Sequence, residues 1–462
     1  MVRFLKKHLN GDGGIRQLLV IAFPMIISQS CDTIMMFTDR IFLSRLTPLH
    51  MASAMSGGLT SFMTTTFFLG LIGYTTALVA QFYGAGRKDY CTVALTQSVL
   101  VAVLSYPVIL SLIPFGLWLF RLSGHSALQQ SLSGDYFKIL MYGTLIPILR
   151  NSFNSFFSGI GKTRIVMISS LVTMTVNIVV NYFLIFGKGG FPALGIRGAA
   201  IGTIAGGLFG LIIVIAGYIS YNISHPHYCF KRSLKFNSEV MKKLLRFGTP
   251  GGIEFFLTLF AFDLLVLLLQ SYGADTAASV TIAFNWDMVS FLPLVGINIG
   301  VISLSGRFSG ADKPELVIRS AYSGLKLAVL YGLLIAILFT VFSGPFVMMF
   351  LPDGVNQHRI MPLAKFMVSM VSFYVFADGC NLVFSGALRG AGDTFWTMLI
   401  SVSFHWMLVA ETVILVKFFH ADPAVTWTFF VFSIPFMALA FYIRFWTGRW
   451  KKIKIIDRPD KI

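Results

Sequence analysis

The sequence predicts an all-α polytopic membrane protein with twelve transmembrane helices, arranged as two parallel-repeat lobes of six helices each. Three observations support this fold class: the composition, the number of apolar runs and an internal repeat. Of the 462 residues, 56% are hydrophobic and only 12% are charged, whereas soluble domains carry about 25% charged residues. The apolar runs leave no long polar stretch for a soluble domain.

The apolar runs define the candidate helices. A helix needs about 20 mostly apolar residues to span a bilayer, and twelve such runs are separated by basic or Gly/Pro-rich breaks. We expect spans at 17–44, 52–82, 94–119, 136–157, 165–187, 197–221, 245–271, 277–305, 320–350, 361–386, 395–418 and 424–446.

The basic residues predict the orientation of these spans. A net charge of +17 first suggests nucleic-acid binding, but Lys and Arg gather in short loops and at both termini. About 25 of the 36 basic residues fall on one side of the predicted topology, which the positive-inside rule identifies as the cytoplasm. We therefore expect an integral protein of the cell (inner) membrane with both termini in the cytoplasm, the lipid bilayer as a partner and no nucleic acid.

Short segments recur in order along the chain. "FPMIISQS" and "TPGGIEFF" place Pro24 and Pro250 at a shift of 226 residues. Two more pairs follow, the second with four extra residues in its later copy: "QFYGAGRK" at 81–88 with "RFSGADK" at 307–313, and "FSGIGKT" at 157–163 with "FSGALRGAGDT" at 384–394. These matches indicate a duplicated chain.

The duplication predicts the domain organisation. Because each half holds an even number of spans, both halves start on the same side of the membrane and the repeats are parallel. We expect an N-lobe at 1–221, a cytoplasmic linker at 222–244, a C-lobe at 245–448 and a basic cytoplasmic tail at 449–462. We also expect the protein to be a monomer.

Acidic residues inside spans are the candidate functional groups. Asp39 lies in the first span, Glu254 near the start of the seventh and Asp378 in the tenth. Such residues are rare in spans and usually face a cavity or a partner. We interpret them as sites for protons, Na⁺ or cationic substrates; the alternative is a buried helix–helix hydrogen bond or ion pair. Glu254 and Asp378 rank first, also as possible Na⁺ ligands, because Arg40 directly follows Asp39.

A buried carboxyl group can couple two transported species. Burial disfavours the ionised form, whereas an approaching cation favours it. A proton or Na⁺ and a cationic substrate can therefore compete for the same carboxylate, which is the minimal requirement of an antiporter. We expect no cofactor besides this coupling ion.

Further polar residues lie in the predicted spans. Asn177 and Asn181 are four residues apart and share one helix face, where they either join helices or coordinate an ion with Asp39. Tyr374 precedes Asp378 by four residues and is expected on the same face. Local explanations, such as a helix–helix hydrogen bond, lower the rank of three further acids: Asp263, Asp287 and Glu411.

Sequence motifs of enzymes are missing. The chain contains no Walker A, HExxH or GxSxG motif, and its four cysteines form no CxxC pair. We therefore expect no enzyme activity, and transport driven by an ion gradient or by partners instead of on-chain ATP hydrolysis.

The chain resembles the multidrug and toxic compound extrusion (MATE) family over essentially its whole length. The segments that carry the resemblance are "FPMIISQSCDTIMMFTDRIFLSRL", "VAQFYGAGRKD", "TVNIVVNYFLIFG", "GTPGGIEFFLTLFAFDLLVLLLQSYG" and "FSGALRGAGDTFWTM". The resemblance implies the MATE/MOP-type fold, alternating access, and export of organic, often cationic compounds in exchange for Na⁺ or H⁺.

The resemblance also implies roles for particular residues. In its NorM-like bacterial branch, the acid pair of the C-lobe falls on Glu254 and Asp378, with Tyr374 beside it. The acid of the first helix falls on Asp39, and the polar cluster of the N-lobe falls on Asn177, Asn181 and Thr203. Arg40 and Asp263 depart from the family pattern: Arg40 could neutralise Asp39, and Asp263 could add a third acid to the C-lobe.

Two other functions are compatible with parts of the sequence. A flippase for lipid-linked saccharides or lipids would share the two-lobe architecture, and Arg40 and Arg150 could line its cavity. A membrane scaffold or receptor without transport activity would leave the duplication and the acids unexplained. The acidic character of the intramembrane charges favours an exporter of organic cations.

Overall fold

The computed structural model describes residues 11–122, 124, 126–225, 235–350 and 357–456. Four basic residues of the predicted linker and tail lie outside these ranges: Lys231, Arg232, Arg458 and Lys461. All regular elements of the described residues are helices, which confirms the all-α prediction. They are α2 (Ile15–Ser44), α3 (Pro48–Gly73), α4 (Thr75–Gly84), α5 (Lys88–Ser111), α6 (Ile113–Leu122), α7 (Ala127–Gly143), α8 (Leu145–Gly159), α9 (Thr163–Phe186), α10 (Ile196–Ser224), α12 (Ser238–Gln270), α13 (Ala274–Gly310), α14 (Pro314–Val341), α15 (Ser343–Met348), α16 (Gln357–Ala391), α17 (Thr394–Val413), η2 (Ile414–Phe418), α18 (Pro423–Trp446) and η3 (Arg449–Lys452).

The helices match the predicted spans. By length and composition, 11 helical segments of the described chain could cross a membrane. The predicted fourth span, 136–157, is the exception: α7 and α8 meet at Thr144, and the segment that they form, which contains Lys138 and Arg150, is not among these 11. α3 and α4 form a single apolar segment, because the residue between them, Tyr74, has helical dihedral angles (φ −61°, ψ −21°).

The chain forms two compact units. The N-unit comprises Ile27–Phe256, and the C-unit comprises Met1–Ile26 and Leu257–Ile462. The divisions fall inside α2 and α12, after Pro24 and Pro250. Proline removes a backbone hydrogen bond and commonly bends a helix. The start of each bent helix therefore packs in a different unit from the rest of that helix.

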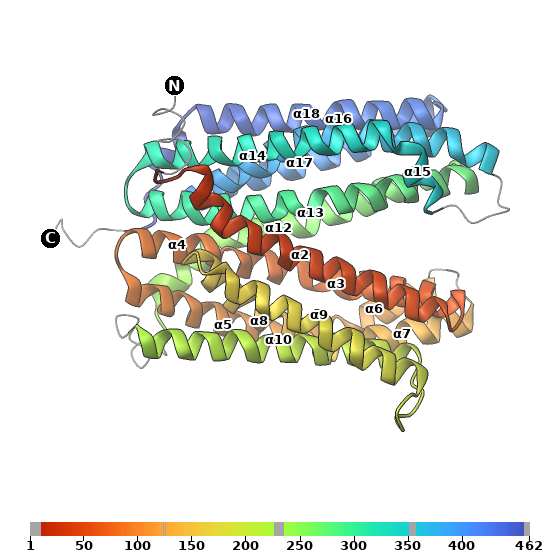
Figure 1. The fold of residues 1–462 in the computed structure, drawn as a ribbon, viewed down its shortest axis with the longest axis horizontal. Coiled ribbons are helices and arrows are strands. Elements are labelled where there is room, and N and C mark those ends of the chain that lie inside the picture. Colours follow the sequence, from red (N-terminus) through yellow and green to blue (C-terminus); the bar gives the residue numbers. More distant parts are fainter. Residues whose placement is uncertain (1–10, 123, 125, 226–234, 351–356, 457–462) are drawn as a thin grey trace. The chain divides into compact units, whose positions relative to one another are not determined.

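In the N-unit, α8 lies at the centre and packs against α3, α4, α5, α7, α9 and α10. α9 and α10 run side by side (Figure 1). Their contact depends on glycines at every fourth position of α10, Gly202, Gly206 and Gly210. A Cβ atom at Gly206 would lie 2.6 Å from the backbone oxygen of Thr173, so only glycine allows this approach.

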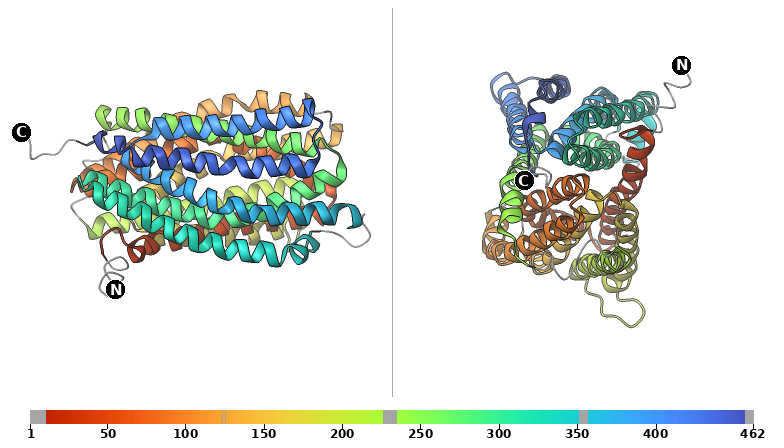
Figure 2. Two further views of the ribbon diagram at one scale, coloured as in Figure 1. Left: turned by 90° about the horizontal axis from the view of Figure 1, so that it is seen from above. Right: turned by 90° about the vertical axis from the view of Figure 1, so that its left-hand side faces the viewer.

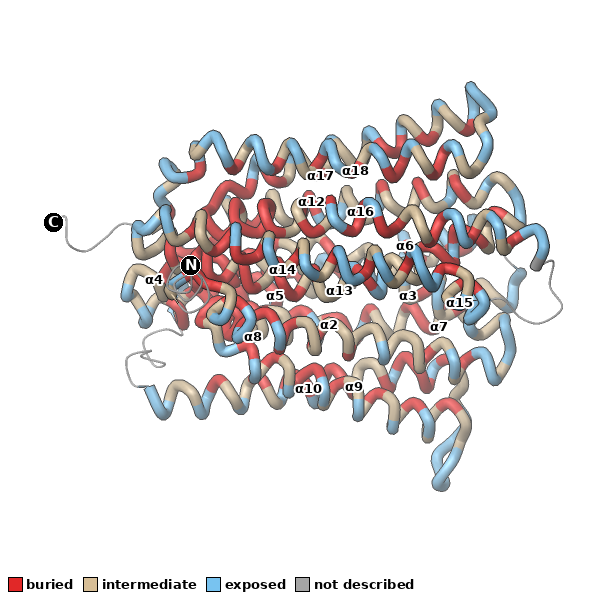
Figure 3. Tube along the Cα trace, turned by 45° about the horizontal axis from the view of Figure 1, so that its top comes forward, coloured by how far each residue is buried: buried red, intermediate tan, exposed pale blue. Residues whose placement is uncertain are grey.

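In the C-unit, α16 has the central position and packs against α13, α14, α15, α17 and α18. The helices run along a common direction, as the end-on view in Figure 2 shows. Along α17 and α18, exposed residues alternate with buried ones (Figure 3). The buried face packs against other helices, and the exposed face is also apolar, with residues such as Phe432 and Phe436, as in a membrane span. Trp427 is fully buried in this core, and its ring contacts Phe284 and Phe430.

The structure repeats itself at the residue level. A Cβ atom at Gly70 of α3 would lie 2.9 Å from Cα of Gly252, and one at Gly296 of α13 would lie 3.0 Å from Cα of Ile26. The two contacts are equivalent at the shift of 226 residues that the sequence predicts, because Gly296 follows Gly70 by 226 residues and Ile26 precedes Gly252 by the same number. Two further equivalent positions both have positive φ: Gly86 with Asp312, and Gly161 with Gly392. The predicted duplication is therefore present in the fold.

Candidate functional site

A polar cluster lies in the N-unit where α2, α7, α9 and α10 meet. Asp39 of α2 is 9% exposed, and it accepts a hydrogen bond from Nδ2 of Asn181. Nδ2 of Asn177 donates to Oγ1 of Thr203 at 3.3 Å, and both groups also interact with the Asp39 carboxylate. The structure thus brings together the four predicted residues Asp39, Asn177, Asn181 and Thr203.

The glycine stripe of α10 positions the amides of this cluster. The Cα atom of Gly202 lies against Asn181, where a Cβ atom would be only 1.8 Å from Oδ1. The side-chain oxygens of Asn177 and Asn181 are buried and accept no hydrogen bond within the described residues. Buried polar atoms usually have a partner. An amide oxygen is also a ligand suited to a hard cation, so the composition of this cluster fits a proton or Na⁺.

Arg40 does not neutralise Asp39. Among the ion pairs of the described residues, none joins these neighbours; instead Nη2 of Arg40 contacts the sulfur of Met36 at 3.7 Å. Tyr136 of α7, which the sequence does not single out, interacts with both Asp39 and Thr203. It extends the cluster to a fifth residue.

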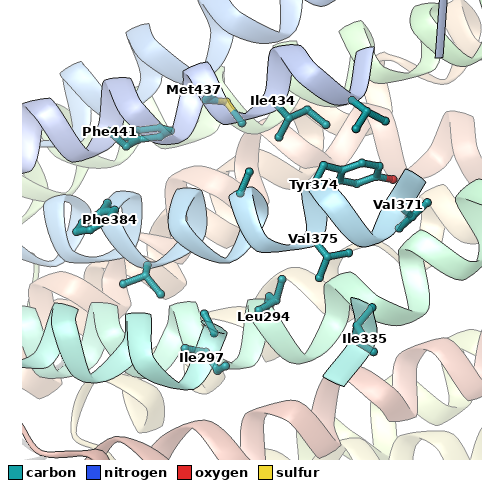
Figure 4. Close-up of a cluster of buried hydrophobic side chains, with 14 of the residues drawn as sticks. Leu294, Ile297, Ile335, Val371, Tyr374, Val375, Phe384, Ile434, Met437 and Phe441 are labelled. Atoms are coloured by element: carbon teal, nitrogen blue, oxygen red, sulfur yellow. The ribbon is translucent and has the colours of Figure 1, made fainter. Parts of the chain in front are cut away.

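A second polar cluster lies in the C-unit between α13, α14 and α16. Tyr374 is 2% exposed and faces Asp287 of α13, and its hydroxyl group is visible in Figure 4. Asp378 accepts a hydrogen bond from Nδ2 of Asn381 at 3.4 Å, and its charge interacts with that of Asp287. The structure therefore places Asp287, which the sequence ranks low, beside the predicted pair Tyr374 and Asp378.

The other acidic residues differ in their surroundings. Glu254 is buried, at 4% exposure, in the part of α12 that belongs to the N-unit, whereas Asp378 belongs to the C-unit. Their pairing, and a Na⁺ site made by them, stay predictions.

Asp263 makes no hydrogen bond or ion pair within the described residues, and its Oδ2 atom is buried. Glu411 of α17 accepts a hydrogen bond from Ser433 of α18 at 2.8 Å.

Metal coordination by several acidic side chains finds no support in the described residues. Within them, no group of three or more His, Cys, Asp or Glu side chains could hold a metal ion. Sequence reasoning also missed Asp32, which forms an ion pair with Arg150. The signal was available, because Asp32 precedes Asp39 by two helical turns on the same face of the first helix.

Comparison with known proteins places the chain among membrane transporters. The family model MatE matches twice, at residues 24–183 and 250–409. "Probable multidrug resistance protein NorM" of Thermotoga maritima is 26% identical over 453 residues, which cover 96% of this chain and 94% of that protein. The protein of the same name from Shewanella oneidensis is 27% identical over 450 residues, with coverages of 93% and 94%.

Solved structures support the fold. A MOP superfamily transporter from Pyrococcus furiosus has a TM-score of 0.84 at 21% identity, and the match covers 97% of this chain and 98% of that one. A multidrug resistance MATE family transporter in an outward-facing conformation has a TM-score of 0.82 at 19% identity, with coverages of 97% and 99%. The two family matches start at Pro24 and Pro250, the same positions that the internal repeat predicts.

Proposed function

Because this chain belongs to the MatE family, we propose that it is a secondary antiporter that exports organic cations in exchange for Na⁺ or H⁺. The relatives named as multidrug resistance proteins support export of drug-like compounds. The single observation that carries the cation specificity is the Asp39 cluster, in which a carboxylate lies beside buried amide oxygens that accept no hydrogen bond, and forms no ion pair among the described residues. Transport would proceed by alternating access of two lobes, without enzyme chemistry, in a monomer.

Each unit would contain an ion site of its own. In the N-unit it would be Asp39 with its amide partners, and in the C-unit Asp378 with Asp287 and Tyr374. Two acids that repel each other at this depth favour uptake of one proton. A substrate cation that approaches either acid favours its ionised form and releases the bound proton or Na⁺.

The flippase alternative is weakened by one observation. Anionic lipid-linked substrates would require arginines with an available charge, and of the two candidates Arg150 is paired with Asp32, which leaves Arg40. An acidic intramembrane cluster fits cationic cargo better.

Transport by purified protein in lipid vesicles tests the proposal. We expect efflux of the cationic dye ethidium under an imposed Na⁺ or H⁺ gradient, applied separately. Glu254→Gln combined with Asp378→Asn should abolish coupled efflux while the protein still inserts. Normal coupled efflux by this double variant would exclude these two acids as the coupling site. Ion-independent flipping of a labelled lipid, without dye efflux, would favour the flippase instead.

A further inference from the structure

An ion pair inside the N-unit joins two transmembrane helices. Nη2 of Arg150, on α8, lies 3.6 Å from Oδ1 of Asp32, on α2. Nη1 of the same guanidinium donates a hydrogen bond to Oγ1 of Thr173, on α9, at 2.5 Å. A Cβ atom at Gly210 would lie 3.2 Å from Nη1 and 2.0 Å from Oγ1 of Thr173. The guanidinium is therefore held in a position that neighbouring α10 leaves open for it.

The two partners differ in their access to solvent. The side chain of Asp32 is 44% exposed, whereas that of Arg150 is only 14% exposed. Asp32 does not lie on the outer face of α2, which carries the exposed Ile34 and Ile41. It lies on the same face as the buried residues Ser28 and Asp39, where Ser28 contacts Ser170 of α9 at 2.6 Å. The carboxylate is thus reachable on the inward side of its helix.

This asymmetry suits an exchange of cations. The ion pair is long, with 3.6 Å between Nη2 of Arg150 and Oδ1 of Asp32. A carboxylate that solvent reaches can be approached by a dissolved cation, while the more buried guanidinium retains its hydrogen bond to Thr173. Arg150 is itself an organic cation, tethered to the protein, with a delocalised charge.

We propose that Asp32 is a binding carboxylate for organic cations, and that Arg150 is its resident counter-ion, which the arriving cation displaces. Arg150 holds the carboxylate in place without substrate, so that no unpaired charge remains within the membrane. The substrate class is monovalent organic cations with delocalised charge, or a guanidinium or ammonium group. This inference names a substrate site for the proposed function and rests on it.

Binding of tetraphenylphosphonium to the purified protein, measured by titration calorimetry, tests the exchange separately from transport. Arg150→Met removes the competing charge and keeps an unbranched, apolar chain in place of the arginine stem; we expect at least tenfold tighter binding. Asp32→Asn should weaken binding at least tenfold, and the double variant should bind like Asp32→Asn. Arg150→Lys, which restores a charge, should return the affinity towards that of the wild type.

A matched control uses another ion pair of the same unit. Arg197 of α10 pairs with Asp135 of α7 at 2.7 Å and is 61% exposed. Arg197→Met should leave the affinity within twofold of the wild type. Thermal unfolding of every variant shows whether it is folded, and Arg150→Met should be the better tolerated single change because the remaining Asp32 can be hydrated.

The outcomes separate the two proposals. Unchanged or weaker binding by folded Arg150→Met, or a double variant that resembles Arg150→Met, would overturn the exchange even if the wild type exports dye. Altered melting temperatures with unchanged affinities would assign the pair a purely structural role and also overturn it. Tighter binding by Arg150→Met in a protein that exports no dye would support the site while the antiporter proposal fails.

Discussion

At the scale of single residues, Asp287 is an acid of the C-unit that lies beside Tyr374 and Asp378. It faces Tyr374, its charge interacts with that of Asp378, and its Oδ1 atom is buried without a hydrogen bond in the described chain. A carboxyl group in this position costs stability unless it binds something. We therefore include Asp287 in the ion site that we propose for this unit.

We predict that Asp287→Asn lowers ion-coupled dye efflux at least tenfold in vesicles, because the amide removes the acidic neighbour that promotes proton uptake by Asp378. Glu411→Gln is the matched control, since Glu411 is an intramembrane acid of the same unit whose hydrogen bond to Ser433 serves helix packing. It should retain more than half of the wild-type rate. Equal rates for the two variants would remove Asp287 from the site.

The residue scale also shows what the sequence could predict. Asp39, Asn177 and Asn181 were recognisable, because a carboxylate and amides are conspicuous in apolar spans. Asp287 was visible but ranked low, since its neighbour Tyr374 lies 87 residues further along the chain. Partners across helices depend on helix rotation, which hydropathy does not specify. The same limit explains why the pairing of Arg150 with Asp32 was not predicted.

At the scale of elements, the packing of α10 against α9 determines the geometry of the N-unit site. Gly202, Gly206 and Gly210 lie opposite Asn181, Asn177 and Thr173, so that each glycine gives room to one polar side chain. Small residues in a membrane helix favour its close approach to a neighbour, and the glycines of α10 do so here. Which polar residues gain space depends on the relative register of the two helices, which the sequence does not specify.

We predict that Gly202→Ala disrupts the site. The new methyl group would overlap Oδ1 of Asn181 and displace the amide that donates to Asp39. Overpacking of this kind costs about 1–3 kcal/mol, and we expect at least a tenfold loss of coupled efflux together with a lower melting temperature.

Gly73→Ala is the control for this substitution, because a Cβ atom at that position of α3 meets nothing within 4 Å. Alanine also favours a helix over glycine by about 1 kcal/mol, so this variant should be at least as stable as the wild type. Wild-type efflux and stability in Gly202→Ala would show that Asn181 can move without loss.

At the scale of the whole molecule, the two halves retain their packing but not their chemistry. Gly70 and Gly296 occupy equivalent positions against the first helix of a repeat. In contrast, the position equivalent to Asp287 at the same shift is Ser61, and that equivalent to Asp39 is Leu265. Apolar periodicity and small residues are constrained by the fold in both halves, so the duplication was readable from the sequence. The packing does not constrain the positions of the acids, so an acid in one half does not predict an acid at the equivalent position of the other half.

The equivalence of the two packing contacts leads to a final prediction. A Cβ atom at Gly70 would lie 2.5 Å from the backbone oxygen of Gly251, and one at Gly296 would lie 2.8 Å from the backbone nitrogen of Ile26. Backbone atoms cannot rotate away as a side chain can, so Gly70→Ala and Gly296→Ala should each destabilise the protein by about 1–3 kcal/mol. Thermal unfolding in detergent measures both effects, with Gly344→Ala as a control that meets nothing within 4 Å. If only one of the two alanines lowered the melting temperature, the first helices of the repeats would not be held by equivalent contacts, and the symmetry would be one of sequence alone.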